Sequence, residues 1–179
     1  MRTITILFGA MLANLIGCAA GWAGPEELAS QILRASGAPG GVCSVVGARD
    51  AGLALAIAER GPFIVHCLCP DNTTCAKVRQ QLRAGSMPGQ VSADLLEEGQ
   101  LPYIDNLVNI LVLQEVRGLA KEELTRVLCP GGVSLDPRMV AQFVRKPWPA
   151  DIDEWTHYLH GPDGNPVAED RVVGPPRHC

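Results

Sequence analysis

The sequence has few aromatic side chains and no grouping of positive charge. Aromatic residues make up 4% of the 179 residues, and the 15 Lys and Arg residues form no run. Base stacking needs aromatic platforms and phosphate binding needs grouped cations, so these shortages argue against a nucleic-acid partner. The sequence also lacks internal repeats, and its glycines and prolines follow no period. Solenoid and collagen-like architectures are therefore excluded.

The remaining composition is that of a folded chain. Hydrophobic residues account for 47% of the sequence, charged residues for 19%, and the net charge is −4. This balance distinguishes the chain from disordered sequences, which combine low hydrophobicity with high net charge. Its length suits one domain of common size with a short appendage.

The most continuous apolar run lies at the N-terminus and is short. Arg2 precedes an apolar stretch over residues 4–16, which is too short to span a bilayer comfortably. We expect residues 1–23 to be a signal peptide, and the protein to be exported, either periplasmic or secreted. Two processing sites remain open. Residues 15–18 resemble a bacterial lipobox, which would lipidate Cys18 and tether the protein to a membrane, whereas residues 21–23 favour cleavage before Gly24. The alternative to export is a buried first helix.

Seven cysteines are present, and export would permit disulfides among them. Cys69 and Cys75 could close a short loop. The pair Cys67 and Cys69 lacks the two-residue spacing of zinc knuckles and redox motifs, so we predict no metal site and rank a redox role below the other functions. A simpler interpretation makes Cys43 and Cys67 small apolar residues inside strands.

Apolar, β-rich runs alternate with helical stretches along the middle of the chain. Helices are expected at 25–36, 53–60, 74–84 and 121–128, and strands at 42–46, 62–68, 90–93, 107–113 and 133–135. This alternation predicts an α/β fold: a Rossmann-like, wound parallel sheet of about five strands with helices on both faces. Ligands bind such sheets at the carboxyl ends of the strands, so the turn after the first strand is the expected site.

The turn after the first strand has partial nucleotide-site spacing. Gly47 and Gly52 flank it, and Asp71 follows the second strand, 19 residues beyond Gly52. An acid about 20 residues after a glycine turn commonly accepts hydrogen bonds from ribose hydroxyls. An ordinary strand-to-helix turn explains the two glycines equally well.

Three stretches together resemble the class I S-adenosylmethionine-dependent methyltransferases: residues 42–71, the sequence LPYIDN at 101–106, and RVLCPGG at 126–132. The resemblance covers about residues 25–136 and implies that residues 24–145 form a methyltransferase-like domain with S-adenosylmethionine as cofactor. It implies that Gly47 and Gly52 admit the cofactor, that Asp71 contacts its ribose, and that Asp94 contacts its adenine. It names no catalytic base and no acceptor pocket.

The sequence departs from that family at several positions. Val45 replaces the acid expected two residues before Gly47, Cys69 stands where an acid usually ends the second strand, and Asn109 lies near the position of an acid in the fourth. The sixth and seventh strands, which form the family's antiparallel edge, have no room. A binding or scaffolding module that has lost the cofactor is therefore the alternative to methyl transfer, and export favours it because S-adenosylmethionine is made in the cytosol.

Residues 146–179 read as a linker and the start of a different unit. DIDEWTHYLH at 151–160 and DRVVGPPRH at 170–178 resemble the segment that opens pyrroloquinoline-quinone-type β-propellers in exported proteins of the planctomycete kind. This resemblance implies a fragment of a longer, quinoprotein-like polypeptide whose quinone would bind only in the missing propeller. Asp153, His157 and His160 share a helical face and could hold a metal, although surface or packing roles explain them more simply.

Overall fold

The computed structural model describes residues 24–85, 89–116 and 118–151, together with residues 158, 162 and 164. The helices are α1 (Pro25–Ser36), α2 (Gly52–Ala58), α3 (Asn72–Ala84) and α4 (Lys121–Val127). The strands are β1 (Gly41–Val46), β2 (Phe63–Cys69), β3 (Val91–Leu95), β4 (Val108–Leu113), β5 (Leu128–Leu135) and β6 (Phe143–Arg145). The expected signal peptide with Cys18, the candidate ligands Asp153, His157 and His160, and nearly all of the propeller-type segment lie outside the described residues.

A single sheet organises the described chain, and it confirms the predicted α/β fold. Its strand order is β3-β2-β1-β4-β5-β6, with β1 to β5 parallel to one another. The expectation that the antiparallel edge has no room was wrong in part, because β6 pairs antiparallel with β5. A tight bend reverses the chain before β6: the N–H of Met139 donates to Asp136 O, and that of Gln142 to Met139 O.

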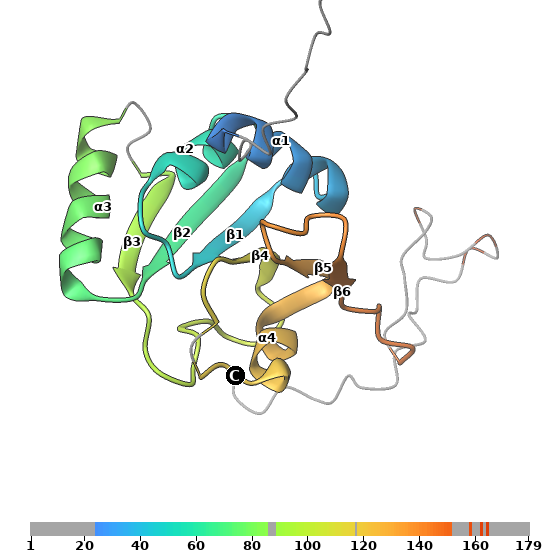
Figure 1. Cartoon of the computed structure of the whole chain (residues 1–179). Coiled ribbons are helices and arrows are strands. Elements are labelled where there is room, and N and C mark those ends of the chain that lie inside the picture. Colours follow the sequence, from blue (N-terminus) through green and yellow to red (C-terminus); the bar gives the residue numbers. More distant parts are fainter. Residues whose placement is uncertain are drawn as a thin grey trace, which may run out of the picture.

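Helices cover the two faces of the sheet unequally (Figure 1). The face bearing α1, α2 and α3 contains the larger core, in which Ile32, Ile57 and Val78 pack against strand residues such as Val65. The opposite face bears α4 and the link between β3 and β4, and its smaller core includes the buried Leu101 and Val127 of those segments. Strands β1, β2, β4 and β5 supply side chains to both cores, because successive side chains of a strand alternate between the two faces of the sheet.

The end of α4 differs from the sequence prediction. Helix α4 ends at Val127, and β5 begins at Leu128, so the Cys-Pro-Gly-Gly stretch lies inside a strand and not in a turn before it. The pairing with β4 shifts register between Val108 and Ile110, as at a β-bulge. Gly132 permits this bulge, because a Cβ there would lie 2.8 Å from the carbonyl oxygen of Cys129 and 2.9 Å from that of Val108.

The two later motifs that carry the family resemblance contact each other through Arg126. Its guanidinium donates to the carbonyl oxygen of Tyr103 at 2.8 Å, to Asp105 at 2.7 Å, and to both carboxylate oxygens of Glu123 at 2.7 and 2.8 Å. Glu123 also accepts the N–H of Leu101 at 2.7 Å. Arg126 therefore fastens the LPYIDN link to α4 and sets the position of Tyr103.

This ion pair gives the domain a defined acid sensitivity. Hydrogen bonds from Arg126 lower the pKa of Glu123 below its ordinary value of 4.5. A lowered folded-state pKa means that the stabilisation is complete above the ordinary value and is lost as the pH falls through the folded-state value. We expect Glu123→Gln, which cannot ionise, to lose less stability than the wild type between about pH 7 and about pH 3, measured by urea unfolding. Equal losses would contradict this assignment.

Candidate functional site

The crevice of this sheet lies between the carboxyl ends of β1 and β4. The two strands are neighbours, but the chain continues from β1 into α2 on one face and from β4 towards α4 on the other. This reversal is the topological switch point at which wound sheets bind ligands. In Figure 1, β1 runs towards the lower left, and the link after β3 passes below the sheet.

Gly47, the first residue after β1, lies at the switch point in a conformation that requires glycine. Its φ is +78°, and a Cβ there would lie 2.4 Å from the Cβ of Glu115 and 2.7 Å from its backbone nitrogen. The Glu115 N–H donates to Val46 O at 3.2 Å, and the Gly47 N–H donates to Leu68 O at 2.8 Å. The turn after β1 is therefore held close to the end of β4.

An ion pair connects the two sides of this crevice. Arg49, in the turn after β1, donates to Oε2 of Glu115, just beyond β4, at 2.9 Å. The Arg49 side chain remains 67% exposed and that of Glu115 20% exposed, so the pair lies at the mouth of the crevice. The sequence pattern had singled out the two glycines of this turn but neither Arg49 nor Glu115.

Gly52 lies at the far end of the same turn. It is the first residue of α2, its N–H donates to Oδ1 of Asp50 at 3.0 Å, and a Cβ there would meet the Pro25 side chain at 3.6 Å. The preceding N–H, that of Ala51, donates to the side chain of Gln81 at 2.9 Å. The turn is thus anchored to α3 and lies beside the start of α1.

Asp71 follows β2 at the same edge and caps α3. Its two carboxylate oxygens accept the N–H and the hydroxyl of Thr74, each at 2.8 Å. These hydrogen bonds lower the pKa of Asp71, so the exposed carboxylate is ionised at neutral pH. Cys69, which stands where the family usually has an acid, is completely buried, which leaves Asp71 as the acid available at the end of β2.

Asp94 ends a polar network that crosses three strands. Its Oδ1 accepts from Arg79 at 2.6 Å, and its Oδ2 lies 3.1 Å from Nε2 of His66. The Tyr103 hydroxyl lies 2.9 Å from Nδ1 of the same histidine and donates to Oγ of Ser44 at 2.8 Å. Burial raises the pKa of Tyr103, so its hydroxyl stays protonated.

Asp94 was expected at this edge, but its partners were not. The sequence pattern placed His66 inside the apolar strand expected at 62–68 and Tyr103 inside the LPYIDN motif, and it gave neither residue a role. The β1–β2 register places Ser44 directly opposite His66. Two polar residues at matching positions in otherwise apolar strands were the signal that could have revealed the network.

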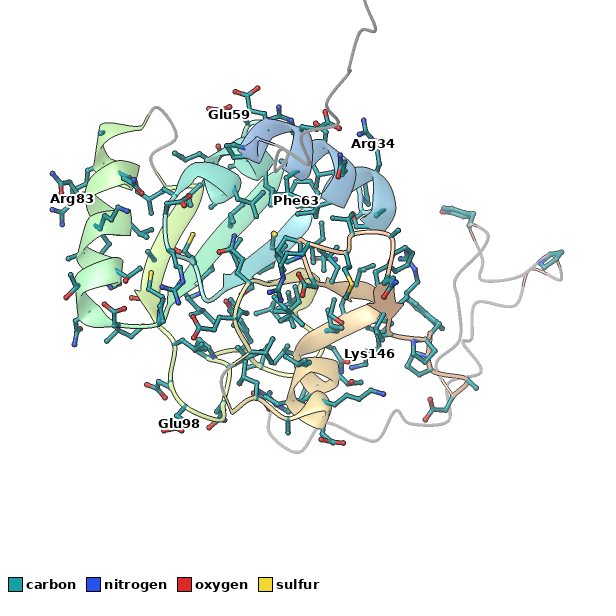
Figure 2. All side chains as sticks on the ribbon, in the orientation of Figure 1. Arg34, Glu59, Phe63, Arg83, Glu98 and Lys146 are labelled. Atoms are coloured by element: carbon teal, nitrogen blue, oxygen red, sulfur yellow. The ribbon has the colours of Figure 1, made fainter. Side chains whose placement is uncertain are left out.

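Two hollows open near the carboxyl edge. One, of about 260 Å³, is lined by Pro70, Leu96, Glu97 and Glu98, which follow β2 and β3. Figure 2 shows Glu98 on the outer side of this loop, directed away from the sheet. The other, of about 230 Å³, lies by α4, β5 and β6 and includes Leu124, Ser134 and Val144. Both are slightly smaller than the roughly 300 Å³ at which small-molecule pockets commonly begin.

Neither a metal site nor a membrane-spanning helix occurs among the described residues. None of the groups of three or more His, Cys, Asp or Glu side chains in those residues could hold a metal ion. Within the same part of the chain, each helix falls short of the length and apolarity needed to cross a membrane.

Solved structures with the same fold are class I methyltransferases and related proteins. A candidate S-adenosyl-L-methionine-dependent methyltransferase from Methanococcus maripaludis matches with a TM-score of 0.55 at 20% identity, over 62% of this chain and 52% of its own. Geranyl diphosphate C-methyltransferase from Streptomyces coelicolor, solved with Mg²⁺, geranyl diphosphate and S-adenosyl-L-homocysteine, matches at 0.53 and 16% identity, over 60% and 44%.

The same fold also hosts another reaction. The 4+2 cyclase SpnF matches with a TM-score of 0.54 at 21% identity, over 61% of this chain and 43% of its own. The present chain thus spans about half the length of these proteins, and at such identities the likeness establishes the methyltransferase-like, Rossmann-type fold alone. No protein-family model and no curated protein matches the sequence.

Proposed function

We propose that this chain is a methyltransferase-like domain that binds S-adenosylmethionine at the carboxyl edge of β1, β2 and β3. The observation that carries the proposal is the Gly47 turn at the switch point, with a φ of +78°, followed along the same edge by the carboxylates of Asp71 and Asp94. Glycine turns and edge acids in this order are the usual means by which wound sheets recognise a nucleoside.

Each part of the cofactor has a chemically suitable partner at this edge. Asp71 is ionised and would accept hydrogen bonds from ribose hydroxyls. Asp94 is exposed and held by Arg79 and His66. Its carboxylate would accept a hydrogen bond from the adenine amino group. The methionine end of the cofactor is a zwitterion, and the pair of Arg49 and Glu115 at the mouth of the crevice offers it one charge of each sign.

The contribution of the chain to methyl transfer would be positional. When bound, S-adenosylmethionine supplies an electrophilic methyl group on a sulfonium. Alignment of that methyl with an acceptor provides most of the rate gain available to such a reaction. The residues named here would orient the nucleoside end and the amino-acid end of the cofactor. They do not include residues that would bind the methyl acceptor.

A calorimetric titration tests the proposal. We expect S-adenosylhomocysteine, the stable demethylated product, to give saturable heat with the purified domain, and NAD to give none. NAD is the matched control because it also contains adenosine and binds Rossmann-like folds. The proposal fails if S-adenosylhomocysteine produces no heat at millimolar concentration, or if NAD binds in its place.

A non-catalytic binding or scaffolding module is the second candidate, and the pair of Arg49 and Glu115 at 2.9 Å is the observation that favours it. In that case the ion pair closes the crevice. Cys69, at the position where methyltransferases usually have an acid at the end of the second strand, would be a position at which a cofactor contact has been lost. The two candidates predict opposite effects of opening the pair.

Arg49→Gln separates the two candidates. If Arg49 binds the carboxylate of the cofactor, the variant should lose about fivefold in affinity for S-adenosylhomocysteine and keep its affinity for methylthioadenosine, which has no amino-acid end. If the ion pair of Arg49 and Glu115 blocks the crevice, the variant should instead gain affinity for both ligands. Arg83→Gln, which changes an exposed arginine at the outer end of α3 (Figure 2), is the control and should match the wild type.

We further propose that the domain is exported as part of a quinoprotein-like polypeptide. The support is the charge and hydropathy pattern of residues 1–23 and the propeller-type strings within 151–178. N-terminal sequencing of the protein from its native host should give Gly24 or a lipidated Cys18 as the first residue. An intact Met1 on the mature protein would contradict export.

A further inference from the structure

The end of β2 and the start of α3 bring two cysteines together. Cys69 is the last residue of β2, and Cys75 lies in the first half of α3. Their thiols are in hydrogen-bonding contact, both are free, and they are 0% and 2% exposed. They share one hydrophobic core with Val65 and Val78. Two thiols in such contact need only small adjustments to reach disulfide geometry.

Cys67 is a third thiol in this core but a poorer partner for Cys69. The two lie on the same face of β2, and same-face neighbours in a strand are separated by about 6.6 Å between their Cα atoms, with parallel side chains. Most disulfides join Cα atoms about 5.5–6 Å apart, with side chains directed towards each other. Cys75 lies on the overlying helix α3 and reaches the same core from outside the strand, as a hydrogen-bonding neighbour of Cys69.

We propose that Cys69 and Cys75 form a disulfide across the turn at residues 70–74 when the protein meets a small-molecule disulfide such as oxidised glutathione. The thiolate of one cysteine attacks the oxidant and releases one glutathione. The second thiolate then displaces the other, which closes the Cys69–Cys75 bond. Two electrons pass to the oxidant, and the two thiol protons end on the released glutathiones.

The disulfide would add a covalent link across the turn at residues 70–74, which joins β2 to α3. The turn contains Asp71, whose carboxylate caps α3 through Thr74, so the bond would tie this cap covalently to the sheet. Burial raises the pKa of Cys69 to about 12, so only a small fraction of this cysteine is thiolate at neutral pH. Oxidation should therefore speed up as the pH rises. The inference is independent of the proposed cofactor.

Peptide mapping after oxidation tests the proposal. The full chain is incubated with oxidised glutathione, the remaining thiols are alkylated, and the protein is cut after Arg60 and Lys77, which leaves all three cysteines in residues 61–77. A second cut before Asp71 separates Cys75 from the other two. We expect the two halves to stay joined until a reductant is added. We also expect the oxidised protein to melt about 5 °C higher than the reduced one.

Three variants identify the pair. Cys75→Ser should abolish the link between the halves, whereas Cys67→Ala should keep it, as should Cys43→Ala, which changes another buried thiol of the same core. The proposal is overturned if the halves separate in the oxidised wild type, or if Cys67→Ala abolishes the link. Circular dichroism of each variant checks that it folds.

Discussion

Replacing Gly47 by alanine is expected to lower the free energy of unfolding by about 3 kcal/mol, the largest effect of any single substitution considered for this crevice. Two costs combine. An L side chain at a φ of +78° is strained, and its Cβ would lie 2.4 Å from the Cβ of Glu115 and 2.7 Å from its backbone nitrogen. Backbone cannot rotate away as a flexible side chain can, so the ends of β1 and β4 must separate. Urea unfolding measures the loss.

Gly131→Ala is the matched control for the conformational cost alone. Gly131 has nearly the same φ, +75°, but a Cβ there would meet no atom within 4 Å. We expect this variant to lose about 1 kcal/mol. Equal losses in the two variants would show that the close approach of Glu115 to Gly47 contributes nothing, and that the crevice is wider than described.

Replacing Asp94 by alanine is expected to weaken S-adenosylhomocysteine binding by at least about tenfold, because a hydrogen bond to a charged group contributes about 1.5–3 kcal/mol. The variant should fold nearly as well as the wild type, since Asp94 is 59% exposed and its pair with Arg79 is a surface ion pair. Calorimetry gives the affinity, and thermal unfolding gives the stability.

Arg79→Gln separates a ligand contact from an effect on shape. This variant removes the arginine that holds Oδ1 of Asp94 but leaves the carboxylate in place. We expect it to lose less than about threefold in affinity. If it loses as much as Asp94→Ala, then Asp94 acts through the Arg79 network and not as a contact to adenine.

Local signals predicted the elements that depend on short stretches of sequence. Helix α1 was predicted with its observed bounds because Pro25 starts it, two glutamates favour its first turn, and Gly37 ends it in the left-handed conformation with its N–H bonded to Leu33 O. The parallel strands β1, β2 and β4 were recognised because buried strands are apolar throughout. Asp71 and Asp94 were placed at the carboxyl edge by the same strand assignments.

Contacts between distant positions escaped prediction. Arg49 and Glu115 are 66 residues apart, and Ser44 and Tyr103 are 59 apart, so no local pattern joins them. Strand β6 has three exposed residues, and its formation depends on the bend at residues 136–142 and not on its own composition. The contact of Asn109 was not predicted either. This residue lies at the start of β4, away from the crevice, where its Oδ1 accepts the N–H of Val42 at 2.9 Å.

The most direct test of the cofactor crevice is a map of backbone amide shifts in the labelled protein as S-adenosylhomocysteine is added. We expect the largest changes at Gly47, Ala48 and Arg49 after β1, and near Asp71 and Asp94 at the ends of β2 and β3. Changes confined to the hollow around Leu124 and Val144, or no changes at saturating ligand, would contradict it.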